Sequence, residues 1–135
     1  LPAYDPRGVQ GHGLAYATSN RGGCHVRAYL IAPEILGSPE KLDSQQLEGK
    51  PTWVKIFQDL TAVIDSIGFC LFTSFALGLD DYKDLINAAL GYDMSSETVL
   101  QTGERIWNME KCFNLNAGIK PKEDSLPARF DEPLP

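Results

Sequence analysis

The spacing of apolar residues follows a helical period through the second half of the chain and is clearest between residues 52 and 65. Apolar residues recur there every three or four positions around Lys55, Gln58 and Asp59, as in an amphipathic helix that packs one face on a core. These residues are Trp53, Val54, Ile56, Phe57, Leu60, Val63 and Ile64. The spacing predicts a helix over residues 52–65.

Two more helices are predicted after this one. LDDYKDLINAALG, residues 79–91, should form a helix that ends at Gly91, because glycine adopts the left-handed conformation that closes many helices. The last helix should begin with Ser95 or Ser96 as its N-cap and carry Glu97 in its first turn, where a negative charge is favourable. The expected apolar faces are Tyr82, Leu85, Ile86, Ala89 and Leu90 in the first helix, and Val99, Leu100, Ile106, Trp107 and Phe113 in the second.

The remaining segments carry weaker signals. Residues 9–19, VQGHGLAYATS, predict a short helix weakened by two glycines, and residues 25–37, HVRAYLIAPEILG, predict a second one that breaks near Pro33. The apolar run LFTSFALG, residues 71–78, predicts a buried helical segment. Strand signals are few, so the chain is expected to form an all-α, multi-helical domain over residues 1–135.

Charge and cysteine content narrow the classes of function. A net charge of −6 argues against binding to nucleic acid or to an anionic membrane, because such surfaces need clustered lysine and arginine. The longest uncharged apolar run, residues 68–79, is shorter than the roughly 18 residues that a membrane-spanning helix needs. Three widely spaced cysteines, Cys24, Cys70 and Cys112, suit neither a disulfide framework nor a zinc site and indicate a reducing compartment.

The segment DSIGFC, residues 65–70, is the first candidate for chemistry. Asp65 falls where the preceding helix should end, Gly68 permits a sharp turn, and Cys70 begins the next apolar run. Such a turn can present backbone N–H groups, a carboxylate and a thiolate to one ligand. The alternative is an ordinary turn between helices, in which Asp65 caps a helix and Cys70 is a small core residue.

The segment YATSNRGGCHVR, residues 16–27, gathers a thiol, an imidazole and two guanidinium groups around paired glycines. It can also be read as a plain turn between helices with a hydrogen-bonded His25. A nucleophile pair of Cys24 with His12 or His25 lacks an orienting partner. A metal site made of Cys24, His25 and Cys70 lacks any repeated ligand spacing.

Taken in order, four blocks of the sequence resemble the C-terminal part of the tungsten-containing aldehyde ferredoxin oxidoreductases. The blocks are AYDPRGVQGHGLAYATSNRGGCHVRAYL, DSIGFCLF, GERIWNMEKCFNLNAG and LPARFDEPLP. Their most specific elements are YDPRG, YATSNRGGCH and D-x-x-G-F-C. The resemblance implies the helical C-terminal domains of that family, so the chain is expected to be a piece of a longer protein.

The resemblance implies an enzyme that oxidises an aldehyde to its carboxylic acid, with ferredoxin as electron acceptor and a tungsten bis-pterin and a 4Fe-4S cluster as cofactors. Asp65 and the backbone around Gly68 and Phe69 would bind the pterin, and Cys70 would supply the fourth thiolate of the cluster. Phe69 stands where the family pattern usually has Leu, an apolar exchange that preserves the turn.

The same resemblance assigns roles in residues 16–27. His25 matches the family's histidine near the tungsten, where it would hydrogen-bond an oxo group or the substrate carbonyl and help to move a proton. Arg27 matches a basic position that contacts the anionic pterin. Cys24 and Cys112 match no ligand position and are interpreted as structural thiols.

Other parts of the family pattern are absent from these 135 residues. The family's remaining three cluster cysteines and its β-rich pterin-cradling domain have no counterpart here. A 4Fe-4S cluster normally takes four protein thiolates, so the chain alone is expected to hold neither cofactor and to be inactive. The resemblance also implies an anaerobic, cytoplasmic setting and allows a homodimer of the parent enzyme.

Two alternatives are left open. A related tungsten enzyme could act on carboxylic acids or aromatic rings with the same cofactor. A cofactor-free helical interaction module could keep the sequence without the chemistry. The joint presence of Asp65, Gly68, Cys70 and His25 argues against the module, because a chain without cofactor has no physical need for that set.

Overall fold

The computed structural model describes residues 3–133, and within this range the chain is helical with no β-strand. Its α-helices are α1 (Gln10–Thr18), α2 (Lys50–Ser66), α3 (Leu79–Leu90) and α4 (Ser96–Asn116). Shorter segments are the π-helix η1 (Ala32–Leu36) and the 3-10 helices η2 (Leu71–Phe75), η3 (Pro121–Glu123) and η4 (Ala128–Phe130). The predicted all-α fold is therefore confirmed.

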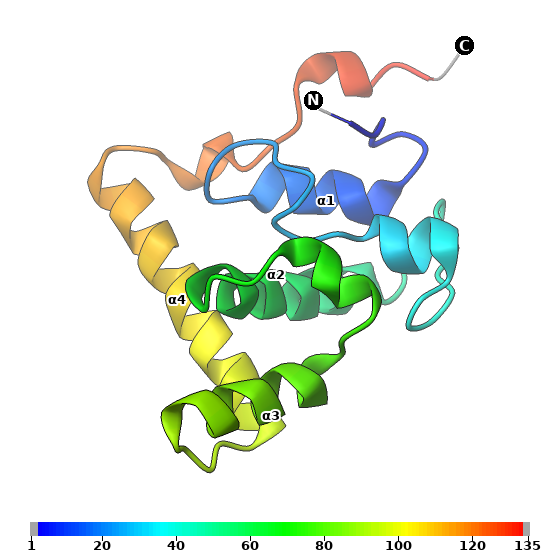
Figure 1. The fold of residues 1–135 in the computed structure, drawn as a ribbon. Helices are drawn as coiled ribbons and strands as arrows, with labels where there is room; N and C mark the ends of the chain where they lie inside the picture. Colours follow the sequence, from blue (N-terminus) through cyan, green and yellow to red (C-terminus); the bar gives the residue numbers. More distant parts are fainter. Residues whose placement is uncertain (1–2, 134–135) are drawn as a thin grey trace.

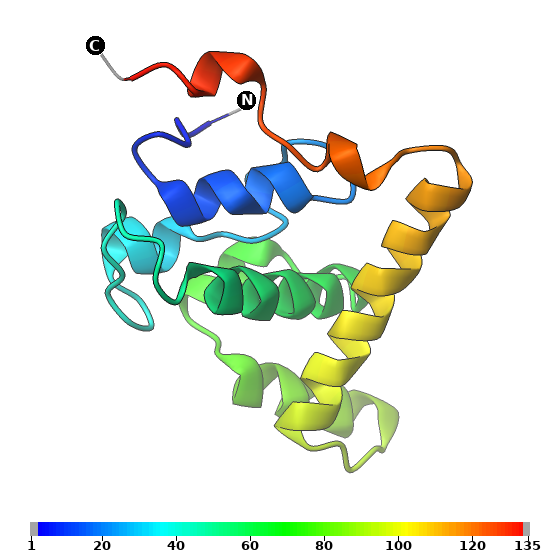
Figure 2. The same cartoon turned by 180° about the vertical axis from the view of Figure 1, so that it is seen from behind.

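Helix α2 lies at the centre of the molecule (Figure 1). Helix α1 packs on one side of it, α4 crosses it obliquely, and α3 packs against the beginning of α4. The view from behind shows the same order, with both ends of the described chain on the side of α1 that faces away from α2 (Figure 2). Helix α2 thus packs against both α1 and α4, and α4 in turn contacts α3.

Helix α2 also carries much of the buried core. It begins at Lys50, two residues before the predicted start, with Pro51 in its first turn, where the missing N–H of proline does no harm. The helix predicted over residues 52–65 is confirmed. Its buried face differs from the predicted one, because Gln58 and Asp59 are buried whereas Trp53, Ile56, Phe57 and Leu60 are only partly buried. The core in and around it contains Ala15, Ala28, Leu30, Val54, Ala62, Val63 and Ile64.

Helices α3 and α4 have the termini that the sequence predicts. Gly91 follows α3 with a φ of 67°, and its N–H donates to the carbonyl of Asn87 at 2.9 Å. Ser95 is the N-cap of α4, and its side-chain oxygen accepts a hydrogen bond from the N–H of Thr98 at 3.2 Å. Each boundary is set by a residue that directly adjoins the helix, so a short stretch of sequence is enough to predict it.

Helices α2 and α4 come closest at Gly103. A methyl group at this position would overlap the backbone carbonyl of Asp59, with its carbon only 2.7 Å from the Asp59 carbonyl carbon. Gly103 is buried on α4. Only a residue without a side chain allows the two helix backbones to approach this closely.

A buried ion pair closes the beginning of α1. The carboxylate of Glu34, in η1, accepts hydrogen bonds from the N–H groups of Gly11 at 2.8 Å and His12 at 2.9 Å. It also pairs with Lys50 at the start of α2, and both charged side chains are almost completely buried. The carboxylate thus satisfies two N–H groups that every helix leaves unpaired at its start, and the lysine neutralises it.

Residues 25–37 do not form the helical piece that the sequence predicts. Regular helical structure is confined to η1 and its N-cap Ile31, and residues 25–30 form turns and bends that lead into it. Pro33 does not break a helix. It lies in the first turn of η1, where the fixed φ of proline is compatible with helical geometry.

Several residues expected on apolar faces are exposed. Residues 71–78 were expected to be buried, yet Phe72 and Phe75 are 68% and 50% exposed. Leu90 on α3 and Phe113 on α4 are exposed as well. An apolar pattern shows which side chains gain by burial, but it does not show whether the chain itself supplies the surface that covers them. Among the described residues, no helix has both the length and the apolar character needed to cross a membrane.

The Gly103 crossing gives a first prediction. Gly103→Ala should lower the free energy of unfolding by about 2 kcal/mol or more, because the added methyl group forces α4 away from the Asp59 carbonyl. Urea unfolding followed by circular dichroism measures this change. Gln101→Ala, at an exposed position of the same helix, should stay within about 0.5 kcal/mol of the unaltered chain. Equal effects of the two substitutions would contradict a close crossing.

Candidate functional site

The turn that follows α2 contains the predicted DSIGFC site. Asp65 lies in the last turn of α2, and Ile67 is the C-cap. Gly68 has a φ of 76°, in the left-handed region that favours glycine. The N–H of Phe69 then donates to the carbonyl of Ile64 at 3.2 Å, which closes the helix end. A side chain at Gly68 would meet no atom within 4 Å, so the turn is open on its outer side.

The thiol of this turn is accessible. Cys70 is exposed, and the ring of Phe69 beside it is 39% exposed. The reading of Cys70 as a small core residue is therefore wrong. Asp65 does not cap the helix either, because its carboxylate accepts a hydrogen bond from the side chain of Arg27 at 2.7 Å. The turn places a carboxylate, a glycine and a thiol along one exposed stretch of chain.

Arg27 brings three parts of the molecule together. Its side chain is 5% exposed, its Nη1 donates to Asp65 Oδ2 at 2.7 Å, and its Nη2 donates to Glu110 Oε2 on α4. The guanidinium carbon lies 4.9 Å from the centre of the Trp107 ring, a cation–π distance. The structure thus brings together two predicted site residues, Arg27 and Asp65, and adds Glu110 and Trp107, which were not predicted as site residues.

The loop that carries Arg27, residues 19–27, is fastened to the helices on both sides. Asn20 Nδ2 donates to the carbonyl of Trp107 at 2.9 Å and to Glu110 Oε2 at 3.3 Å. The hydroxyl of Thr61, on α2, donates to the carbonyl of Arg27. Because the loop has no regular structure of its own over these residues, the hydrogen bonds to α2 and α4 fix where Arg27 and His25 lie.

His25 lies in the same loop but in different surroundings. It is partly buried, and its ring centre is 6.3 Å from that of Tyr4 in an edge-on arrangement. The hydroxyl groups of Tyr4 and Tyr29 are hydrogen-bonded at 2.8 Å. Among residues 3–133, no hydrogen bond or ion pair joins His25 to Asp65 or Cys70. His25 lies two residues before Arg27 in the chain, and its ring neighbour is Tyr4.

His12 is a buried histidine, which the sequence suggests only as a partner of Cys24 in a nucleophile pair. Its side chain is fully buried, with its ring centre 4.6 Å from Tyr16 and 5.3 Å from Tyr4. Neither ring nitrogen has a hydrogen-bond partner among the described residues. Burial lowers the pKa of His12 from 6.5 to about 4, with a smaller contribution from the charge of His25. His12 is thus neutral at pH 7.

The other cysteines have unlike environments. Cys24 is partly buried, and its sulfur accepts hydrogen bonds from Arg21 Nε at 3.3 Å and Nη2 at 3.2 Å. Cys112 is exposed on α4, so it does not fill a space in the core as a structural thiol would. No group of three or more histidine, cysteine or acidic residues within residues 3–133 converges on a point that could hold a metal ion.

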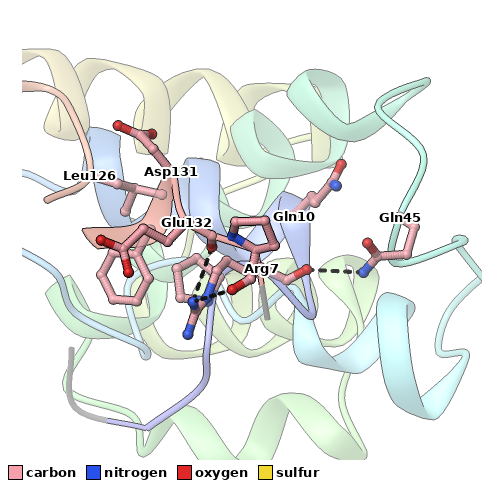
Figure 3. Close-up of a pocket in the computed structure, with 9 residues that line it drawn as sticks. Arg7, Gln10, Gln45, Leu126, Asp131 and Glu132 are labelled. Carbon is pink, nitrogen blue, oxygen red and sulfur yellow. Dashed lines mark hydrogen bonds between the residues drawn. The ribbon is translucent and has the colours of Figure 1, made fainter. Parts of the chain in front are cut away.

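A separate pocket lies where the two ends of the described chain meet. Its volume is about 470 Å³, and the residues that line it are drawn in Figure 3. Arg7 lies at its centre, where Nη1 donates to the carbonyl of Glu132 at 3.1 Å and Nη2 pairs with Asp5 at 2.7 Å. The hydrogen bonds that Asp5 accepts from the side chain and the backbone N–H of Arg7 lower the pKa of Asp5 to about 2. The YDPRG element therefore binds the C-terminal segment, and none of the predicted site residues line this pocket.

The family comparison covers every residue of the chain. The sequence profile described as "Aldehyde ferredoxin oxidoreductase, domains 2 & 3" matches residues 1–135. The chain belongs to the aldehyde ferredoxin oxidoreductase family. The resemblance carried by the four sequence blocks is confirmed.

Three relatives in this family are similar over the whole chain. Proteins of Pyrococcus horikoshii, Pyrococcus abyssi and Thermococcus kodakarensis, each named tungsten-containing aldehyde ferredoxin oxidoreductase, are 61%, 61% and 59% identical to it. The alignments cover 100% of this chain and 23% of each relative. The chain thus spans about a quarter of the length of these relatives.

The individual roles of the site residues in this family member stay predictions. Asp65, Gly68, Phe69 and Cys70 lie in one exposed turn, and Arg27 contacts Asp65. Glu110 and Trp107 were missed because the acidic and aromatic residues of an amphipathic helix have many uses, and only the fold shows that they face Arg27. The signal that was available is their place in the block GERIWNMEKCFNLNAG.

The exposure of the turn after α2 can be tested with an alkylating reagent. In the folded 135-residue chain, iodoacetamide should modify Cys70 and Cys112 readily and Cys24 more slowly, because Cys24 is partly buried against Arg21. Peptide mapping by mass spectrometry measures the three rates, and Cys70→Ser serves as the control that assigns the peptide. Modification of Cys70 only after addition of denaturant would contradict this description of the turn.

The buried imidazole of His12 makes stability depend on pH. Its pKa in the folded chain, about 4, lies below the value of 6.5 for an exposed histidine, so the unfolded chain takes up the proton first. Stability should be complete above pH 6.5 and fall by roughly 3 kcal/mol as the pH decreases to about 4.

Urea unfolding at a series of pH values measures this effect of His12. His12→Phe should remove this part of the pH dependence, whereas His25→Gln, which alters the other histidine of the chain, should retain it. An unchanged pH profile in His12→Phe would show that the buried imidazole is not the cause.

Proposed function

We propose that this chain is part of a tungsten-dependent oxidoreductase that converts aldehydes to carboxylic acids and passes the electrons to ferredoxin. The observation that carries the proposal is the match of the whole chain, at about 60% identity, to proteins named tungsten-containing aldehyde ferredoxin oxidoreductase. The open turn after α2 supports this proposal, because it presents a carboxylate that can bind a pterin and a thiol that can bind an iron–sulfur cluster.

The residues of the turn fit a pterin in their chemistry. Asp65 uses only Oδ2 to bind Arg27, and no described residue donates to Oδ1. Its side chain is 40% exposed. A carboxylate oxygen in this state can accept hydrogen bonds from the N–H groups of the pterin ring. Gly68 adds space, because no side chain or neighbouring atom fills the outer side of the turn there.

Cys70 fits one ligand position of a 4Fe-4S cluster. Such a cluster is held by cysteine thiolates, commonly four. The exposed thiol of Cys70 can be one of them, and no group within residues 3–133 supplies the others. The remaining thiolates would therefore come from outside this chain, and the 135 residues on their own are proposed to be inactive.

When bound, the cofactors would supply the redox chemistry, by which an aldehyde and one water give the carboxylic acid, two protons and two electrons. The residues of this chain would bind and orient the cofactors and the substrate. Asp65 would hold the pterin ring by hydrogen bonds, and Cys70 would be a ligand of the cluster. Arg27 adds a buried positive charge beside Asp65, which favours an anionic cofactor.

His25 is proposed to handle a proton. Its imidazole would hydrogen-bond an oxo group or the carbonyl oxygen of the aldehyde and help to move a proton. Its partly buried place beside Tyr4 limits access of solvent to the ring, which is a condition for directed proton transfer. The proposal also includes an aldehyde as substrate, ferredoxin as electron acceptor and a homodimer of the parent enzyme. It further includes an anaerobic, cytoplasmic setting.

Metal analysis of the full-length gene product tests the function. Purified without oxygen, it should contain about one tungsten and four irons per chain and should reduce ferredoxin when an aldehyde is added. Cys70→Ser should lose most of the iron, whereas Cys112→Ser, which removes another exposed thiol, should keep it. Inductively coupled plasma mass spectrometry gives both metal contents.

Other results would redirect the proposal. A protein that holds tungsten but reduces ferredoxin only with substrates other than aldehydes would be a tungsten enzyme of another reaction. A protein with neither tungsten nor iron would contradict the cofactor roles of Asp65, Cys70 and His25 altogether.

A further inference from the structure

We propose that Arg27 is a positioning residue: held by Glu110 and Trp107, it fixes one oxygen of Asp65 so that the other oxygen is presented to the pterin. This inference rests on the proposed function. It differs from the role expected from the resemblance, in which Arg27 itself touches the pterin. The relevant contacts all lie within this chain.

Both terminal nitrogens of the Arg27 guanidinium group already have partners within the chain. Nη1 binds Asp65 and Nη2 binds Glu110, while the Trp107 ring lies against its guanidinium carbon. With a side chain that is 5% exposed, Arg27 could reach a ligand outside the chain only by giving up these contacts. A planar guanidinium group that binds two carboxylates at once is a rigid link, so it transmits position rather than binding the ligand itself.

Asp65 occupies a place that helix stability does not favour. It lies in the last turn of α2, where the partial negative charge of the helix end repels a carboxylate. It makes no cap to the helix, and the positive charge that offsets it comes from Arg27. A carboxylate kept at such a place, with one oxygen bound and one exposed, is arranged to receive hydrogen bonds from a ligand.

The contacts of Arg27 with Asp65 and Glu110 also include features that lower the stability of the fold. Nε of Arg27 is buried without a hydrogen-bond partner, and an unpaired buried donor is unfavourable. Two carboxylates, on Asp65 and Glu110, share one guanidinium group. Local rules of stability are broken most often at functional sites, and here they are broken at the residue that holds Asp65 in place.

A double-mutant cycle on the full-length gene product tests the inference. Arg27→Lys keeps the charge but cannot bind both carboxylates as a fork. It should lower the tungsten and pterin content per chain about tenfold or more, as for other residues that orient a ligand group. Asp65→Asn should have a similar effect, and the double variant should lose no more than Asp65→Asn alone, because Arg27 acts through Asp65.

Three further measurements separate positioning from a general loss of structure. The unfolding temperature of Arg27→Lys should stay near that of the unaltered protein, and the tungsten signal in electron paramagnetic resonance should change alike in Arg27→Lys and Asp65→Asn. Glu104→Gln is the matched control, because Glu104 also lies on α4 and pairs with Lys55 rather than with Arg27. Should Arg27→Lys fail to fold, Glu110→Gln weakens the same link from the other side and should show a smaller loss of cofactor.

Each contrary outcome has a distinct meaning. Normal cofactor content in both Arg27→Lys and Glu110→Gln overturns the inference and leaves the proposed function standing. Losses that multiply in the double variant also overturn it, because Arg27 would then contact the cofactor independently of Asp65. An unaltered protein without tungsten and pterin overturns the proposed function and, with it, this inference.

Discussion

The close approach of α2 and α4 at Gly103 is the constraint on which the rest of the site depends. Because a side chain at this position would overlap the Asp59 carbonyl, the two backbones lie in contact there. Trp107 and Glu110 follow four and seven positions later on α4, one and two helical turns along the same face. The crossing thus brings them within reach of Arg27, and Arg27 carries the link on to the end of α2.

The site is therefore assembled from irregular segments held by two rigid helices. The loop of residues 19–27 has no regular structure of its own, and hydrogen bonds to α2 and α4 fasten it. The turn after α2 is closed instead by its own backbone hydrogen bonds to the last turn of the helix. This division is common in enzymes, where loops supply the reactive groups and regular elements set their positions. Tyr4 packs edge-on against both the buried His12 and His25 of the same loop.

The sequence predicted those features that depend on neighbours in the chain. Gly91 ends α3 and Ser95 begins α4 because a glycine or a hydroxyl at a helix end acts within a few residues. Gly103, the burial of His12 and the pairing of Arg27 with Glu110 depend on contacts between distant segments, so no local pattern reveals them. The burial expected for residues 71–78 was wrong for a related reason: it needs a covering surface that lies beyond the local pattern.

The buried pair of Glu34 and Lys50 has a consequence for the response of the fold to heat. Moving two charges out of water is unfavourable, and this penalty decreases as temperature rises, because the hydration of ions carries a strongly negative entropy. The attraction between the paired charges and the two bonds to the start of α1 persist. The net contribution of this pair to the junction of α1, η1 and α2 therefore grows on warming, at the temperatures where burial of apolar surface no longer gains strength.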